Sequence, residues 1–140
     1  RGILAGYLEM KNALVNDDGP AAANAGKTIM TAIDKIDKTT LGATQKKAYE
    51  DLADDIKENA EHCSENGNKI EHQREQFEML SKDMYDLVKA FGGGQTLYYD
   101  YCPMANDNKG AAWISEIKEI KNPYGGKSMA TCGSIKEELK

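Results

Sequence analysis

The feature that most constrains the fold is a helical repeat of apolar residues, found in four runs before residue 92. In the longest run, over residues 69–91, apolar side chains recur mostly three or four residues apart, a spacing that gathers them on one helix face. These residues are Ile70, Phe77, Leu80, Met84, Leu87, Val88 and Phe91. A helix of about 22 residues is roughly 33 Å long at about 1.5 Å per residue, and Gly92-Gly93-Gly94 would end it sharply.

Three earlier runs have the same periodicity and predict helices over residues 2–16, 20–38 and 44–65. Only short connections separate these three helices and the one over 69–91. Short connections between amphipathic helices are typical of an antiparallel four-helix bundle. We therefore expect a single, mainly α domain over residues 1–140, since no linker or internal repeat indicates a second one.

Helix ends are predicted from proline, glycine and capping residues. Pro20 suits the first position of the second helix, because its missing N–H would have no partner there in any case. Thr44 is the expected cap of the third helix, and Gly67 offers it a left-handed end. Asn68 and Glu71 have the spacing of a capping box, which predicts the start of the fourth helix.

The character of the chain changes after the three glycines, and residues 92–140 are expected to form an irregular tail with room for a short hairpin. Residues 96–101 are aromatic and favour β structure. Residues 112–120 fit either a short helix or an extended segment, with Trp113 anchoring it on the bundle. Residues 134–139 fit a last helical turn.

Two pairs of sulfur side chains lie in this tail. Cys102 and Met104 flank a proline, and Met129 and Cys132 are followed by a glycine. Two thiolates and two thioethers suit Cu(I) or Ag(I), and zinc is less favoured because it rarely takes methionine as a ligand. The spacing fits equally well a disulfide between Cys102 and Cys132, with both methionines filling gaps. The sequence pattern leaves these two alternatives open.

The two histidines give little support for a metal site from their positions alone. His72 is expected on the face of the fourth helix that is turned away from the apolar stripe, towards solvent or whatever packs there. His62 is adjacent to Cys63, and neighbouring residues of a helix diverge by about 100°, so they do not easily share an ion. Both histidines are therefore interpreted as structural at this point.

The charge and the residue pattern argue against several classes of function. A net charge of −5, with basic residues interleaved among acidic ones, disfavours nucleic acid as a partner. No apolar run approaches the roughly 20 residues that a membrane-spanning helix needs. No Ser/His/Asp or Cys/His arrangement stands out, so we expect no enzymatic activity. The sequence starts at Arg1 without an initiator methionine or a leader, as expected of a mature or trimmed chain that does not include its targeting segment.

Several ordered residue sets resemble a bacterial domain family of unknown function that occurs alone in exported proteins or attached to copper/silver-efflux membrane-fusion proteins. The resemblance extends over nearly the whole chain. It rests on Tyr7-Leu8, Lys11-Asn12-Ala13-Leu14-Val15, His72-Gln73-Arg74-Glu75, Phe77, Leu80-Ser81, Cys102-Pro103-Met104-Ala105, Trp113-Ile114-Ser115, Asn122-Pro123-Tyr124, Met129 and Cys132-Gly133. This chain departs from the family pattern at Gly125-Gly126 and by the additional Cys63.

The resemblance implies a periplasmic or outer-surface domain that binds Cu(I) or Ag(I), for sequestration or for transfer to efflux-system proteins. The implied metal ligands are Cys102, Met104, Met129, Cys132 and His72. For these residues to meet, the tail must fold back so that the two cysteines approach each other and the N-terminal end of the fourth helix. The alternative is a structural or adaptor domain in which a disulfide between the two tail cysteines pins the tail and leaves a surface for a protein partner.

Overall fold

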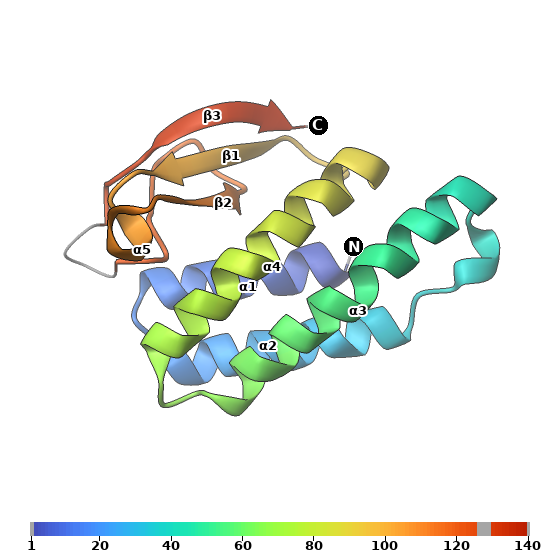
Figure 1. The fold of residues 1–140 in the computed structure, drawn as a ribbon, viewed down its shortest axis with the longest axis horizontal. Helices are drawn as coiled ribbons and strands as arrows, with labels where there is room; N and C mark the ends of the chain where they lie inside the picture. The colour runs from blue at the N-terminus through green and yellow to red at the C-terminus, as the bar shows by residue number, and fades with distance from the viewer. Residues whose placement is uncertain (1, 126–129, 140) are drawn as a thin grey trace.

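The computed structural model describes residues 2–125 and 130–139. Its helical body contains the four predicted helices, joined in chain order by short connections (Figure 1). They are α1 (Gly2–Val15), α2 (Gly19–Asp34), α3 (Ala43–Glu65) and α4 (Ile70–Phe91), with a short 3-10 helix η1 (Lys38–Thr40) between α2 and α3. The prediction of a mainly helical bundle is confirmed. None of the helices in the described part of the chain is both long and apolar enough to cross a membrane.

Each helix packs on the next one in sequence, and glycines allow two of these contacts to be close. A Cβ at Gly6 would lie 2.7 Å from the Ile29 side chain, and one at Gly26 would lie 2.5 Å from the carbonyl oxygen of Ala60. Side chains at these two positions would force α1 away from α2 and α2 away from α3. The absence of a side chain at each position therefore sets the separation between neighbouring helices.

The second helix ends four residues before the predicted end, because an aspartate stabilises a separate turn after it. The Asp37 carboxylate accepts hydrogen bonds from both the backbone N–H and the hydroxyl of Thr39, at 3.0 and 2.6 Å. These bonds lower the pKa of Asp37 and hold the η1 turn. Residues 35–38 therefore lie outside α2, where the periodicity had predicted helix.

The predicted caps are wrong at three helix ends. Helix α3 begins after Gly42 and has no side-chain cap, so Thr44 lies inside it. The residue after its end, Asn66, has a negative φ of −122°, and Gly67 does not have a positive φ, so Gly67 does not provide a left-handed end. Helix α4 begins after Lys69, again without a side-chain cap.

The capping-box residue Glu71 has another partner, since its carboxylate accepts a hydrogen bond from Arg74 at 2.9 Å. At the start of α2, Asp18 is the cap and accepts from the N–H of Ala21 at 3.0 Å, so Pro20 occupies the second helical position.

The described part of the tail contains a small antiparallel sheet, so the prediction of an irregular region with a short hairpin is confirmed only in part. Its strands are β1 (Leu97–Cys102), β2 (Ala111–Ser115) and β3 (Ser134–Leu139), with a short helix α5 (Ala105–Asn108) between β1 and β2. The order in the sheet is β2-β1-β3, so the expected hairpin is formed by β1 and β2. The prediction of a helical turn over 134–139 is wrong, because these residues pair with the second edge of β1.

The sheet packs on the side of α4 opposite to α3, with β2 against α4 and α1 (Figure 1). Trp113 and Ile114 of β2 are fully buried there and belong to the same apolar core as Tyr7 and Phe77. The rings of Tyr7 and Phe77 are stacked with centroids 4.8 Å apart. The prediction that Trp113 anchors its segment on the bundle is confirmed.

Candidate functional site

The pairing of β1 with β3 brings together the two cysteines of the tail. Cys102 is the last residue of β1, and Cys132 lies two residues before β3 begins. Tyr101 of β1 is paired with Ser134 of β3. Cys102 directly follows Tyr101, and Cys132 comes two residues before Ser134, so this pairing brings the two cysteines close together. Their sulfur atoms form a disulfide with a Cα–Cα distance of 5.6 Å, although 30 residues separate them in sequence. The expected approach of Cys102 and Cys132 is therefore confirmed.

The disulfide lies at the end of the sheet where β1 connects to β2, and it is only partly accessible to solvent. Cys102 is fully buried, whereas Cys132 is half-buried. The Asn122 side chain donates to the carbonyl oxygen of Cys132 at 3.1 Å and so fixes the segment that carries it. The next residue, Gly133, has a φ of 144° and lies so close to the Trp113 ring that a Cβ would be 3.0 Å away. Glycine is thus required beside the second cysteine.

Of the two methionines in the proposed ligand set, only Met104 belongs to the residues that the structure describes. Met104 follows Cys102 by two residues, in the turn before α5, and 53% of it is exposed. Met129 lies outside the described residues. The structure therefore brings two sulfur atoms into direct contact and leaves the side chain of Met104, two residues after Cys102, exposed on the surface.

His72 is in the first turn of α4, and no described contact connects it to the cysteines. Its Nδ1 atom lies 3.2 Å from a carboxylate oxygen of Glu75, and the side chain is 47% exposed. Arg74, two residues along, points into the protein and contacts the tail. Residues two apart on a helix diverge by about 200°, so His72 is directed away from the part of the tail that Arg74 contacts.

The donor set fits a soft metal ion only when the disulfide is reduced, because thiolates bind metals and a disulfide does not supply them. Among residues 2–125 and 130–139, no group of three or more His, Cys, Asp or Glu side chains is placed to hold a metal ion. The third cysteine, Cys63, is buried in the helical body, and burial raises its pKa to about 12. Cys63 is therefore a core residue rather than a ligand.

Arg74 ties the tail to the turn between α1 and α2. Its guanidinium donates to the carbonyl oxygens of Pro123 and Leu14, at 2.8 and 2.9 Å. It also donates to the carboxylates of Asp17, at 2.6 Å, and Glu71, at 2.9 Å. The side chain is only 7% exposed, so these partners compensate for burying its charge.

A second buried polar cluster joins α1, α4 and the sheet through two tyrosines. The Tyr7 hydroxyl lies 2.7 Å from Ser81 Oγ and accepts the backbone N–H of Ile114 at 2.9 Å. The Tyr124 hydroxyl donates to the carbonyl oxygen of Ala112 at 2.6 Å. Burial raises the pKa of both phenols well above the usual range, so both remain neutral hydrogen-bonding groups.

A third cluster contains two charged residues that are completely buried, Lys11 and Asp100. Lys11 forms an ion pair with Glu116 at 2.5 Å. Burial opposes ionisation of Glu116, but hydrogen bonds from Lys11 and Asn12 outweigh it and lower the pKa of this carboxyl. Neither carboxylate oxygen of Asp100 has a hydrogen-bond partner among the described residues, and burial raises its pKa to about 7 against the opposing charge of Lys11.

These clusters explain most of the residue sets that carried the resemblance. Tyr7, Lys11, Arg74, Ser81 and Tyr124 join the helices to one another or to the tail. The neighbour of Arg74, Gln73, donates to the carbonyl oxygens of Gly19 and Cys63, both at 3.0 Å. This role was not predicted from the sequence. A signal for it is present, because these polar residues occur within or beside the apolar helical stripes.

The fold and the site define a small helical domain with a C-terminal sheet that is closed by a disulfide. The chain belongs to the family described as "Protein of unknown function (DUF3347)", which matches residues 3–96, about two thirds of its length. This confirms the resemblance to a domain family of unknown function. The matched residues contain α2, α3 and α4 and all of α1 except its first residue, and they end just before β1, so both tail cysteines lie beyond them. No curated protein and no solved structure matches the chain.

Proposed function

We propose that this chain is an extracytoplasmic domain that captures Cu(I) or Ag(I) through Cys102 and Cys132 when both are reduced. The supporting observation is that the strand register holds these two sulfur atoms together although 30 residues separate them. A soft monovalent ion takes thiolate and thioether ligands, and two converging thiolates supply the strong pair.

Met104 is the proposed third ligand. Its exposed position two residues after Cys102 leaves the thioether free to turn towards an ion held by the cysteines. Met129 is the proposed fourth ligand from its place in the sequence. His72 is left out of this set, because its described partner is Glu75 and helix geometry directs it away from the tail contact of Arg74. The ion is treated as cargo, to be sequestered or transferred to efflux-system proteins.

The disulfide itself favours a second candidate, a structural or adaptor domain in which the bond stays closed. Disulfides persist in oxidising compartments such as the periplasm, so both candidates place the chain outside the cytoplasm. They differ in one respect. Capture of an ion needs a state in which the two sulfurs are thiolates, whereas the adaptor needs the bond at all times.

Competition with a Cu(I)-specific chelator separates these candidates. The fully reduced protein should take one Cu(I) from the chelator, and the double variant Cys102→Ser with Cys132→Ser should lose this binding. Cys63→Ser is the matched control, because it removes the buried thiol and should leave affinity unchanged. Affinity should fall as the pH is lowered, since the thiols must lose protons to bind.

Met104→Leu should weaken binding, while Met79→Leu, which removes another exposed methionine, should not. Unchanged affinity in the double serine variant would overturn metal capture. A reduced protein that takes up no Cu(I), together with an intact mass showing the disulfide in untreated protein, would favour the adaptor.

A further inference from the structure

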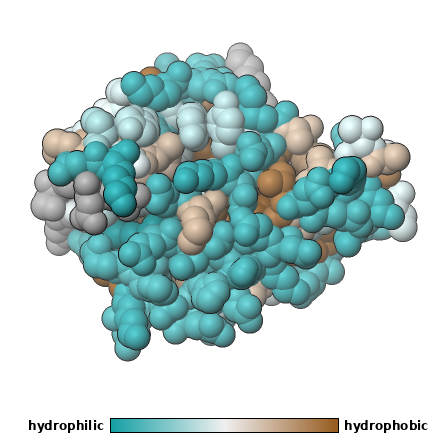
Figure 2. All heavy atoms as spheres, in the orientation of Figure 1, coloured by the Kyte–Doolittle hydropathy of each residue, from teal (hydrophilic) through white to brown (hydrophobic). Residues whose placement is uncertain are grey.

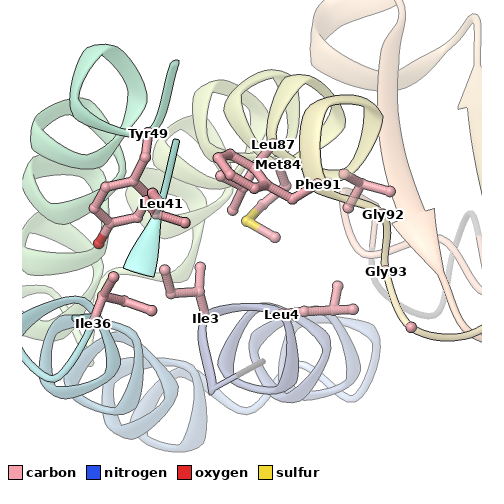
Figure 3. A pocket seen from close by; sticks show the side chains of 12 residues that line it. Ile3, Leu4, Ile36, Leu41, Tyr49, Met84, Leu87, Phe91, Gly92 and Gly93 are labelled. Atoms are coloured by element: carbon pink, nitrogen blue, oxygen red, sulfur yellow. The ribbon is translucent and has the colours of Figure 1, made fainter. Parts of the chain in front are cut away.

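A hollow remains at the end of the helical body where α4 stops and the chain turns towards β1. Figure 3 shows it between the start of α1, the segment that joins α2 to α3, and the last two turns of α4. Its volume is about 320 Å³, within the range of small-molecule sites and far larger than the gaps of a packed interior. We call this hollow the Tyr49 pocket. It lies at the opposite end of β1 from the disulfide.

The walls of the Tyr49 pocket are apolar, and three glycines in its lining help to keep it open because they have no side chains to fill it. Ile3, Ile36, Leu41, Met84 and Phe91 line it from several segments of the chain. Gly92, Gly93 and Gly94 form a further part of the wall without contributing side chains. Figure 2 shows hydrophobic atoms gathered in a notch near the same end of the body, where the surrounding surface is mostly hydrophilic.

One polar group in this lining has no partner. Tyr49 is 4% exposed, and its hydroxyl forms no hydrogen bond with any of the described residues. In Figure 3 its ring forms one wall and its hydroxyl end points towards Ile36. A buried hydroxyl without a partner costs about 1–3 kcal/mol, so such a group in a native protein is usually satisfied by water or by a ligand.

The surroundings limit the charge of a ligand. Among the residues that the structure describes, no charged side chain lines the pocket. Burial raises the pKa of Tyr49, and the negative charge of Asp34 raises it further, so the hydroxyl keeps its proton. The same negative charge would repel an anionic group placed beside the hydroxyl. A cation would lose its hydration in an apolar site without gaining a carboxylate partner there.

We propose that the Tyr49 pocket binds an uncharged, mostly apolar small molecule with one hydroxyl or carbonyl group, which forms a hydrogen bond with the Tyr49 hydroxyl. The volume of about 320 Å³ fits roughly ten non-hydrogen atoms, at about 30 Å³ for each. Apolar walls supply affinity, and the single polar group fixes the orientation of the ligand. This site is independent of the two tail cysteines and of any metal ion.

The test uses the intact oxidised protein with 1-naphthol as the probe and naphthalene as its matched analogue without a hydroxyl. Methionine methyl groups are labelled with ¹³C, and their NMR shifts are followed during titration. Met84 lines the pocket, whereas the exposed Met79 and Met104 do not. We expect a saturable shift at Met84 with no comparable shift at the other two methionines.

Two variants test the contribution of the hydroxyl and of the cavity. Tyr49→Phe should weaken 1-naphthol binding about 2- to 10-fold, the value of one hydrogen bond, and leave naphthalene binding unchanged. Tyr85→Phe, at a tyrosine whose hydroxyl donates to Glu137 outside the pocket, should leave both unchanged. Leu41→Trp should fill the hollow and abolish binding of both probes.

The absence of a saturable Met84 shift up to the solubility limit of 1-naphthol would overturn the proposal. Equal shifts at Met79, Met84 and Met104 would also overturn it, because they indicate association with the surface. If Tyr49→Phe weakens both probes equally, the hydroxyl does not bind the ligand and the proposed ligand class is wrong.

Discussion

Helices α1 to α4 pack on one another mainly through apolar and small side chains, whereas the joint with the sheet combines a shared apolar core with hydrogen bonds from buried polar side chains. Gly6 and Gly26 set the helix spacing within the body. At the joint with the tail, the partners are the Tyr7 hydroxyl for Ile114 and the Arg74 guanidinium for Pro123. Apolar contacts tolerate small shifts, but buried hydrogen bonds have strict geometry and are costly to leave unpaired. The sheet should therefore have one docked position.

The outer strand β3 is attached by the same kind of contact. Glu137 accepts hydrogen bonds from the Tyr85 hydroxyl and the Lys89 ammonium of α4, both at 2.7 Å. Strand β3 is otherwise mostly exposed, and Leu139 is its only buried residue in the described part of the chain. We therefore expect that the sheet can be loosened without unfolding the helices, whereas unfolding the helices also releases the sheet.

The largest expected effect comes from removing the main apolar anchor of the sheet. Trp113→Ala should cost about 3–5 kcal/mol, the usual range for a fully buried aromatic residue. Hydrogen exchange followed by mass spectrometry should show lost protection in β1, β2 and β3 and retained protection in α2 and α3. The matched variant Ile56→Ala, in the core of α3, should reduce protection in both regions. If the tryptophan variant unfolds the helices equally, body and sheet form one cooperative unit and the comparison is wrong.

Removing the disulfide should have the next largest effect. Closing a loop of 30 residues stabilises the fold by about 3–4 kcal/mol, because it restricts the unfolded chain. Cys102→Ser combined with Cys132→Ser should lower the denaturant midpoint by the corresponding amount, with the first loss of exchange protection in β3. Cys63→Ser provides the control for replacing a cysteine without breaking the bond. Equal midpoints for the double variant and the reduced wild-type protein would assign the effect to the bond itself.

Asp100 should make stability depend on pH. Its pKa is about 7 in the folded chain against an ordinary value of 3.8, so folding favours the protonated form. Stability from this group is present at low pH and is lost as the pH rises between these values, by up to about 1.4 kcal/mol per pH unit. Asp100→Asn should therefore gain about 2–3 kcal/mol relative to wild type between pH 5 and pH 7, measured by urea unfolding at each pH.

The quantity to compare is the difference in unfolding free energy between wild type and Asp100→Asn at each pH. A second carboxyl also has a raised pKa and lowers stability as the pH rises, so the wild-type profile alone does not isolate Asp100. Burial and the neighbouring Asp55 raise the pKa of Asp83 to about 7, and this group remains in both proteins. Parallel pH profiles for wild type and the variant would show that Asp100 does not titrate in this range.

The smallest effect tests a single hydrogen bond at the joint. Tyr7→Phe leaves the N–H of Ile114 without its partner, while the Ser81 hydroxyl keeps the Tyr124 hydroxyl at 3.3 Å, so the change should cost about 1–3 kcal/mol. The emission of Trp113, the one tryptophan of the chain, should report the loosened sheet at lower denaturant than the helical circular dichroism signal. Tyr98→Phe, at a half-buried position of β1, should leave both transitions in place.

The helices could be predicted from sequence because each one carries its own apolar stripe, which is local information. Their ends were less predictable, since the competing turn at Asp37 depends on one side-chain geometry. Strand β3 was missed because its residues are mostly exposed and polar, and its structure comes from the free edge of β1. Pairing across that edge depends on residues more than thirty positions away.

The sequence predicted that Cys102 and Cys132 meet, but it did not predict the chemistry of the pair. The spacing of Cys102 and Cys132 did not distinguish a disulfide from a pair of ligands, and the strand register brought the two sulfurs together. The burial of Lys11 and Arg74 was not predicted, because a charged residue is buried only when distant segments supply its partners.

The position of the disulfide also determines how the sheet would respond to a mechanical load. Leu139 of β3 pairs with the first residue of β1, and Ser134 pairs near its end. A force applied to the chain beyond Leu139 would peel the ladder one residue pair at a time, starting at the end far from the bond. Peeling would stop at Cys132, where the load passes through a covalent bond into β1. Strand β3 would then act as a short extensible tether with a fixed limit.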